Sequence, residues 1–172
     1  FAQNLFTQNG NEFRSSNGAP GASYWQNRAN YNLHATIDTV TNILKGEETI
    51  SYINNSPDAL TSLWLQLDQN TYRKDARSNF YTEAPSGLPG TDKNHTDGYQ
   101  FEKVMIEYKG KTIKAEYIIN DTRMQIRLPV ALSSKEKIAI HLKYQYTVPG
   151  VFGGRNDFFS TKNGKIYEIA QW

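Results

Sequence analysis

The chain has 172 residues, which is enough for one domain with a single sizeable core and too few for two full domains. Its 19 basic and 17 acidic residues give a net charge of +2 and are interspersed, which excludes the basic stripe of a nucleic-acid or anionic-membrane binder. The absence of cysteine excludes disulfides, thiolate metal sites and thiol nucleophiles. No apolar run approaches the ~20 residues of a membrane-spanning helix.

Residues 1–23 show no hydrophobic periodicity and are rich in Asn, Gln, Gly and Ser. We expect a flexible lead-in here, followed by one domain over residues 24–172. The chain starts at Phe1, and this polar start is typical of a mature end left after signal cleavage. The protein is therefore expected to be exported, to a periplasm, a cell surface or the medium.

The first strands are predicted by apolar residues that alternate with polar ones. Residues 31–37 form one such run, and residues 45–54 form the next. Residues 63–67 carry leucine at every second position, after an Asn-Asn-Ser-Pro-Asp tract that favours tight turns. The stretch 45–70 is thus predicted to be a β-hairpin with one buried face.

Residues 68–80 are polar with a possible short helix, and residues 82–98 form a long loop rich in Gly, Pro, Asp and Asn. Further strands are predicted over 101–108, 115–119 and 124–128, as a meander, and over 138–146, where the alternation is strict. A last hairpin is expected about Asn163-Gly164. The fold class is all-β: an antiparallel β-sandwich or saddle-like domain of about eight or nine short strands.

Residues suited to catalysis or metal binding are scattered. The histidines are His34, His95 and His141, and no His-Glu-x-x-His pattern places two of them on one helix face. A three-histidine site formed by folding is conceivable, but the favoured interpretation places His34 and His141 on the polar faces of strands. Glu47 and Glu48 are neighbours on one strand, so they point to opposite faces and cannot form an acid–base pair.

Two other patterns also favour structural roles. No Gly-x-Ser-x-Gly nucleophile motif occurs. Gly153-Gly154 is followed by neither Lys-Ser/Thr nor a helix, so a turn is preferred to a phosphate loop. The sequence therefore predicts no catalytic residue, no metal ligand and no cofactor within this chain.

Three tracts resemble a known family. The run LWLQLDQN in residues 63–70, the Gly-rich stretch 151–155 and the pair Ala170-Gln171 are similar to elements of the N-terminal β domain of aminopeptidase N-like (gluzincin) zinc metallopeptidases, especially their bacterial secreted branch. The departure is Ala170, where Thr is common. The family's zinc site and its Gly-x-Met-Glu-Asn loop lie in a catalytic domain that these residues do not contain.

The resemblance implies a role for the chain. It would be an inactive N-terminal domain that caps the catalytic domain of the same parent polypeptide, with zinc held by that catalytic domain. It implies that Gln171 contacts the amino end of a peptide substrate. Without the resemblance, Gln171 is interpreted as an amide at the end of a strand that forms a hydrogen bond with the neighbouring backbone. The last predicted strand is interrupted at Trp172, which favours a longer parent polypeptide.

The alternative is a free-standing carbohydrate-binding or adhesion module. Aromatic residues around the long loop, Tyr72, Phe80, Tyr81 and Tyr99, could stack on sugar faces, or could pack the loop onto its own sheet. A sugar module should expose two or three coplanar rings. A peptidase cap should expose an apolar flank near residues 150–172.

Overall fold

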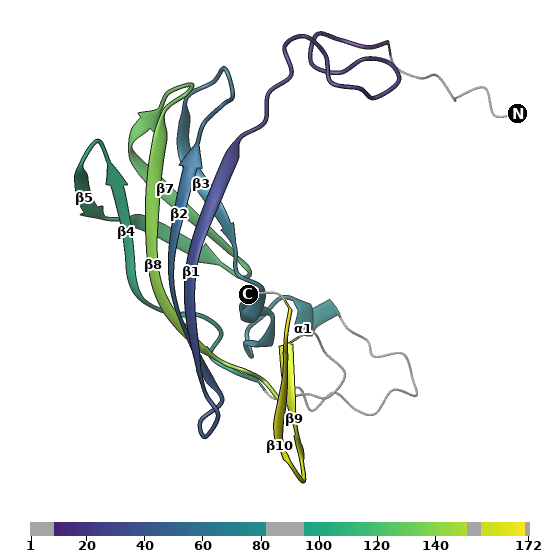
Figure 1. The fold of residues 1–172 in the computed structure, drawn as a ribbon, viewed down its shortest axis with the longest axis vertical. Helices are drawn as coiled ribbons and strands as arrows, with labels where there is room; N and C mark the ends of the chain where they lie inside the picture. Colours follow the sequence, from purple (N-terminus) through teal and green to yellow (C-terminus); the bar gives the residue numbers. More distant parts are fainter. Residues whose placement is uncertain (1–8, 82–94, 151–155, 171–172) are drawn as a thin grey trace, which may run out of the picture.

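Two facing antiparallel sheets and a projecting hairpin make up the protein (Figure 1). A computed structural model describes residues 9–81, 95–150 and 156–170. The strands are β1 (Arg28–Asp38), β2 (Ile43–Ile53), β3 (Leu60–Gln66), β4 (Gln100–Tyr108), β5 (Lys111–Lys114), β6 (Glu116–Asn120), β7 (Arg123–Leu132), β8 (Lys137–Thr147), β9 (Asn156–Thr161) and β10 (Gly164–Ile169). The predicted all-β sandwich is confirmed, with ten strands in the described residues.

Helical structure is sparse. Among the described residues, it comprises a 3-10 helix over Asp68–Tyr72 and one short helix, α1, over Ser78–Tyr81. Both fall in the polar segment for which the sequence predicts a short helix. No helix of the described part of the chain is long and apolar enough to cross a membrane.

The larger sheet has the strand order β1-β2-β8-β4-β5, with β8 in its middle. Side chains of β8 alternate strictly, because successive residues of a strand point to opposite faces. Ile138, Ile140, Leu142, Tyr144 and Tyr146 are buried on the inner face. The strand predicted from this alternation is confirmed.

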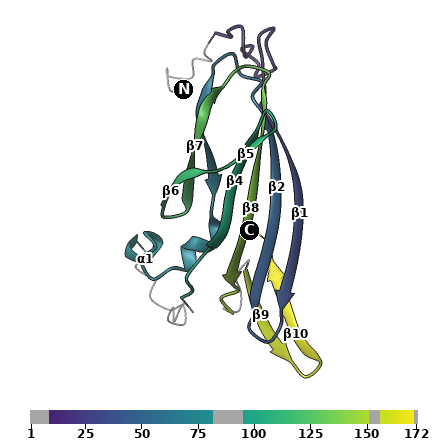
Figure 2. The same cartoon turned by 90° about the vertical axis from the view of Figure 1, so that its left-hand side faces the viewer.

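The smaller sheet, in the order β3-β7-β6, covers the inner face of the larger one (Figure 2). Its most deeply buried members are Met124, Ile126 and Leu132 of β7, whose exposed fractions round to zero. These residues share one hydrophobic cluster with Ile106 of β4 and Ile140 of β8. The two sheets therefore enclose a single core.

The predicted hairpin over residues 45–70 is wrong, because its two strands lie in different sheets. β2 pairs with β1 and β8, whereas β3 pairs with β7. The connection passes from the larger sheet to the smaller one. It is fixed by the fully buried side chain of Asn54, whose Nδ2 donates hydrogen bonds to the carbonyl oxygens of Asp58 and Leu132, each at 2.8 Å. Both strands carry an apolar face, and these faces are buried by opposing one another across the sandwich.

The predicted meander is also corrected at one point. After the turn at Lys109 and Gly110, β5 pairs with β4, but β6 pairs with β7 in the other sheet. The switch occurs at Ala115, which is buried and whose N–H donates to the carbonyl oxygen of Val104 at 3.0 Å. The strand predicted over 115–119 thus corresponds to β6 in the smaller sheet, and β5, which was not predicted, extends the larger sheet.

The hairpin predicted about Asn163-Gly164 is confirmed as β9 and β10. Gly164 has a φ of +126°, a conformation that L side chains rarely adopt. The hairpin extends beyond the sandwich at the end where the β1–β2 turn lies (Figures 1 and 2).

Candidate functional site

The three histidines do not meet in space to form a site. His141 lies on the outer face of β8, with Nδ1 3.0 Å from Thr49 Oγ1 and Nε2 3.0 Å from Glu107 Oε2. His34 is exposed on β1, and His95 Nδ1 is 3.3 Å from the carbonyl oxygen of Tyr72. In the described ranges, no group of three or more His, Cys, Asp or Glu residues could hold a metal ion.

Glu47 and Glu48 point to opposite faces of β2, as their spacing predicts. Glu47 lies on the outer face, where its carboxylate is 3.6 Å from the ammonium of Lys143, which also contacts Glu102 at 3.1 Å. Glu48 lies on the inner face, and its partial burial raises the pKa of its carboxyl group. The two carboxylates therefore have separate surroundings.

Gln171, the residue expected to contact substrate, lies outside the described residues, as does the Gly-rich stretch 151–155. The described part nearest to Gln171 is β10, which ends at Ile169. The surface around the β9–β10 hairpin, which precedes Gln171 in the chain, is called the hairpin end. It comprises residues 39–42, 68–81 and 156–170.

Asn42 attaches the hairpin to the sandwich. Its Oδ1 accepts hydrogen bonds from Tyr167 OH and from Lys165 Nζ, each at 2.7 Å. Its carbonyl oxygen accepts the N–H of Val148 at 2.9 Å, which fixes the β1–β2 turn to the end of β8. Asn42 has a φ of +58°, a left-handed conformation that Asn tolerates better than most residues. One turn residue thus holds three segments.

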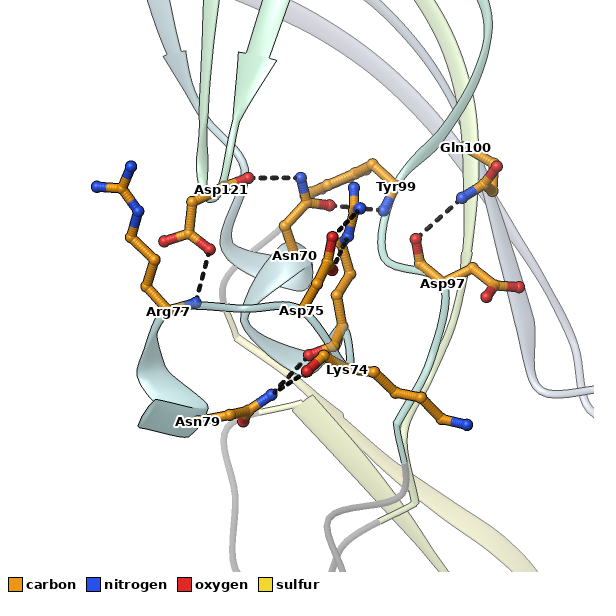
Figure 3. A network of polar contacts seen from close by, with 10 residues as sticks. Asn70, Lys74, Asp75, Arg77, Asn79, Asp97, Tyr99, Gln100 and Asp121 are labelled. Atoms are coloured by element: carbon orange, nitrogen blue, oxygen red, sulfur yellow. Dashed lines mark hydrogen bonds and ion pairs between the residues drawn. The ribbon is translucent and has the colours of Figure 1, made fainter. Parts of the chain in front are cut away.

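Asn70 fixes the 3-10 helix to the sandwich (Figure 3). Its buried Nδ2 donates to the carbonyl oxygen of Asp121 at 2.8 Å, and its Oδ1 accepts the N–H of Tyr99 at 2.9 Å. Gly98 has a φ of +65°, and a Cβ added there would collide with Asn70 Oδ1. This site therefore requires glycine next to the asparagine.

Further polar contacts order the segment between the 3-10 helix and α1 (Figure 3). Asn79 Nδ2 donates to the carbonyl oxygens of Arg73 and Lys74 at 2.8 and 3.0 Å. The N–H of Arg77 donates to Asp121 Oδ1 at 3.2 Å, which ties the segment to the β6–β7 turn. The segment is thus held from both of its sides.

Large apolar side chains are exposed at the hairpin end. Val40 of the β1–β2 turn is 85% exposed, Phe80 of α1 is 79% exposed, and Ile166 of β10 is 48% exposed. Ile166 lies within the range where an apolar flank is expected of a peptidase cap. These three side chains lie on separate elements, and each adds exposed apolar area to the hairpin end.

The aromatic residues proposed for sugar binding do not form one exposed row. Tyr99 is buried, with its ring stacked on Phe101 at 5.7 Å and edge-on to Tyr144 at 5.3 Å. Tyr72 is half-buried, and Phe80 is exposed. The side chain of Tyr81 lies outside the described part. Tyr99 is therefore a core residue and is withdrawn from the sugar-binding hypothesis.

Sequence reasoning missed Asn42 and Asn70 as the residues that hold this end together. For Asn42 a signal exists, because Asn is favoured in a turn position with positive φ. For Asn70 there is none, since its partners Tyr99 and Asp121 are 29 and 51 residues away.

Comparisons with known proteins give structural neighbours of one kind. No protein family matches the sequence, and no curated protein is significantly similar to it. Among solved structures, the chain is similar to a two-domain M1 zinc metallopeptidase mutant bound to L-tryptophan, with a TM-score of 0.45 and 14% identity over 79% of this chain and 24% of that one. It is also similar to the M1 zinc metallopeptidase of Deinococcus radiodurans, with a TM-score of 0.46 and 15% identity over 80% of this chain and 26% of that one.

A mutant of the Deinococcus radiodurans metallopeptidase bound to a Tyr-Ser-Ala substrate gives a TM-score of 0.46 at 16% identity, over 81% of this chain and 26% of the other. The chain thus spans about a quarter of the length of these metallopeptidases. Similarity at this level does not assign the chain to a family.

Proposed function

We propose that the chain is the N-terminal β domain of a zinc aminopeptidase of the bacterial secreted branch. In this role it caps the catalytic domain of the same polypeptide, narrows the substrate cleft and helps to position the amino end of the peptide. The proposal begins from the sequence resemblance in residues 63–70, 151–155 and 170–171. The structural observation that carries it is the hairpin end.

The hairpin end has the properties that a cap requires. β10 runs toward Gln171 from a base held by Asn42, through Tyr167 OH and Lys165 Nζ. Positioning residues act only when the backbone that carries them is itself held in place. The exposed Phe80 and Ile166 supply apolar area for contact with the proposed catalytic domain.

As the sequence resemblance implies, zinc would reside in the proposed catalytic domain. There, zinc supplies an activated water for peptide hydrolysis. The chain itself contributes shape, apolar contact and the Gln171 amide. It is proposed to have no hydrolytic activity of its own.

The first experiment is to determine the coding sequence that follows Trp172. A reading frame that continues into His-Glu-x-x-His with a second Glu downstream supports the proposal. A stop codon directly after Trp172 contradicts it and favours the free-standing binding module.

The second experiment tests Gln171 in the parent enzyme. Gln171→Ala is expected to lower kcat/KM for peptides with a free amino terminus about tenfold, which corresponds to the loss of one transition-state hydrogen bond. Gln26→Ala is the matched control, because Gln26 is exposed and precedes β1 at the end of that strand opposite to the β1–β2 turn. Equal kcat/KM for both variants and the wild type would refute the assigned role of Gln171.

Export is the remaining part of the proposal, and it is supported by the polar, Asn- and Gln-rich start of the chain. Cell fractionation of the native host with an antibody against this domain tests it. Detection in the periplasm, on the surface or in the medium is expected, and confinement to the cytosol would contradict it.

A further inference from the structure

A cavity opens on the inner side of the sandwich, where the edge strands β1 and β3 leave the core uncovered. Its volume is about 260 Å³, and it is lined by side chains that include Tyr31, Glu48, Leu65, Tyr99, Phe101 and Tyr144. An adjoining cavity of about 260 Å³ continues toward residue 27 and shares Tyr31 and Leu65. Tyr31 and Trp64 at this opening are 65% and 59% exposed, so the cavity is accessible from solvent.

Glu48 places a carboxylate among apolar side chains of this cavity. In the sheet register it lies between Leu33 of β1 and Leu142 of β8, and Ile50 follows it on the same face of β2. No hydrogen bond or ion pair joins its carboxylate to any residue in the described part of the chain. A carboxylate held among apolar groups without a partner costs folding free energy.

Within this cavity, no cationic side chain of the described residues faces Glu48. Neither Lys nor Arg lines the cavity. The second acidic residue there, Asp68, accepts a hydrogen bond from Gln66 Nε2 at 3.2 Å. Burial raises the pKa of the Glu48 carboxyl group, and the Glu48 charge helps burial to raise the pKa of the Tyr144 hydroxyl. The site therefore has negative charge and no internal counter-ion.

Aromatic rings complete the wall. The Phe101 and Tyr144 rings lie 5.9 Å apart between centroids, and Tyr99 contacts both at 5.7 and 5.3 Å. Aromatic rings beside a carboxylate attract cations through their negative faces, and they also bury apolar groups. The aromatic lining thus suits a ligand with a cationic group and an apolar body, because the rings can contact both.

We propose that this cavity binds an organic ammonium ion, with the ammonium paired to Glu48 and the apolar body packed among Tyr31, Leu65 and Phe101. The cavity borders the hairpin end at Asp68, but the proposal does not depend on the proposed peptidase role. Its occupant is a small amine with an aromatic or aliphatic body, because a cavity of about 260 Å³ has room for one small ligand.

The test uses phenethylamine and its neutral analogue 2-phenylethanol as probes, titrated into the ¹⁵N-labelled protein at pH 7. Phenethylamine is expected to bind about tenfold more tightly than 2-phenylethanol, since only the amine pairs with a partly desolvated carboxylate. The amides that shift should be those of β2, β4 and β8 around Glu48. Equal affinity for the two probes, or shifts elsewhere in the molecule, would overturn the proposal.

Three charge-neutralising variants assign the pairing. Glu48→Gln is expected to remove the preference for the amine, while Glu47→Gln, its neighbour on the outer face, keeps it. Asp68→Asn tests the other carboxylate of the cavity. Loss of the preference in Asp68→Asn but not in Glu48→Gln would refute the assignment to Glu48.

A stability measurement separates a binding role from a structural one. Glu48→Leu supplies the apolar residue that the neighbours Leu33 and Leu142 would accommodate, so its thermal midpoint should rise while amine binding is lost. This variant is expected to fold, which keeps the binding experiment interpretable. A lowered midpoint would show that Glu48 stabilises the sandwich, and it would contradict the binding role.

Discussion

Asn70 Oδ1 accepts the backbone N–H of Tyr99 at 2.9 Å, and this bond joins the 3-10 helix to the segment that leads into β4. The same side chain donates to the carbonyl oxygen of Asp121 at 2.8 Å in the β6–β7 turn. One buried amide therefore connects both sheets to the polar segment at the hairpin end (Figure 3).

Asn70→Ala is expected to lower the free energy of unfolding by about 3 kcal/mol, because it leaves the N–H of Tyr99 and the carbonyl oxygen of Asp121 without their partner. Urea unfolding followed by tryptophan fluorescence measures the change. Asn32→Ala, on the exposed edge strand β1, is the control and should change the value by less than about 0.5 kcal/mol. Equal effects of the two substitutions would contradict the connecting role of Asn70.

Tyr167→Phe removes the hydrogen bond from the Tyr167 hydroxyl to Asn42 Oδ1. We expect the β9–β10 hairpin to be destabilised locally by about 1 kcal/mol. Hydrogen exchange of the β9 and β10 amides should then become about fivefold faster, with the amides of β8 unchanged. Tyr117→Phe on β6 serves as the control, since its hydroxyl makes no hydrogen bond to the described residues. Faster exchange throughout the sandwich would argue against local attachment.

Glu136 links two turns and gives a pH dependence. Its carboxylate lies 2.8 Å from Lys109 Nζ, accepts Tyr108 OH at 2.7 Å and accepts the N–H of Ser133 at 3.0 Å. These contacts, Lys109 first, lower the pKa of Glu136 from 4.5 to about 2. A lowered pKa stabilises the fold above pH 4.5, and this contribution is lost as the pH falls toward 2.

The difference in unfolding free energy between the wild type and Glu136→Gln should therefore have its largest value at pH 6. It should decrease as the pH falls from 4.5 to 2. Urea unfolding across this range measures it. Glu116→Gln is the control, because the Glu116 side chain is exposed and its ion pair with Arg127 is long, at 4.0 Å. A difference that stayed constant with pH would show that the Glu136 contacts do not depend on its charge.

Gly46→Ala tests the packing of β2 against Tyr144. A Cβ at position 46 would lie 2.6 Å from Tyr144 Cζ and 2.9 Å from its hydroxyl oxygen. Tyr144 is buried, so its ring can move little, and the substitution should cost about 1–3 kcal/mol despite the better strand propensity of Ala. Thermal unfolding measures the cost. The same substitution in a Tyr144→Leu background should cost less, and an equal cost would exclude the ring as its cause.

The strands were predictable wherever one face is buried and the other is not. β8 alternates from Ile138 to Tyr146 because it lies in the middle of the larger sheet with its inner face against the core. The β9–β10 hairpin was predictable from Asn163-Gly164, since its turn is a local property of two residues.

The pairing of strands was less predictable. The connection after Asn54 was predicted to be a hairpin turn, yet it crosses to the other sheet through bonds to Asp58 and Leu132. The contact with Leu132 spans 78 residues, so no local pattern signals it. The change of sheet at Ala115, between β5 and β6, has the same origin, because sheet membership depends on distant partners.

The sequence by itself determined that the protein is built of antiparallel strands, because period-two burial and turn propensity are properties of neighbouring residues. It also determined that Glu47 and Glu48 point to opposite faces of β2. Only the tertiary structure decided which sheet each strand joins, that Asn42 and Asn70 hold the hairpin end, and that Glu48 faces an aromatic cavity without a cation. These features arise from contacts between residues far apart in the chain, and their free energies depend on burial that exists only in the folded protein.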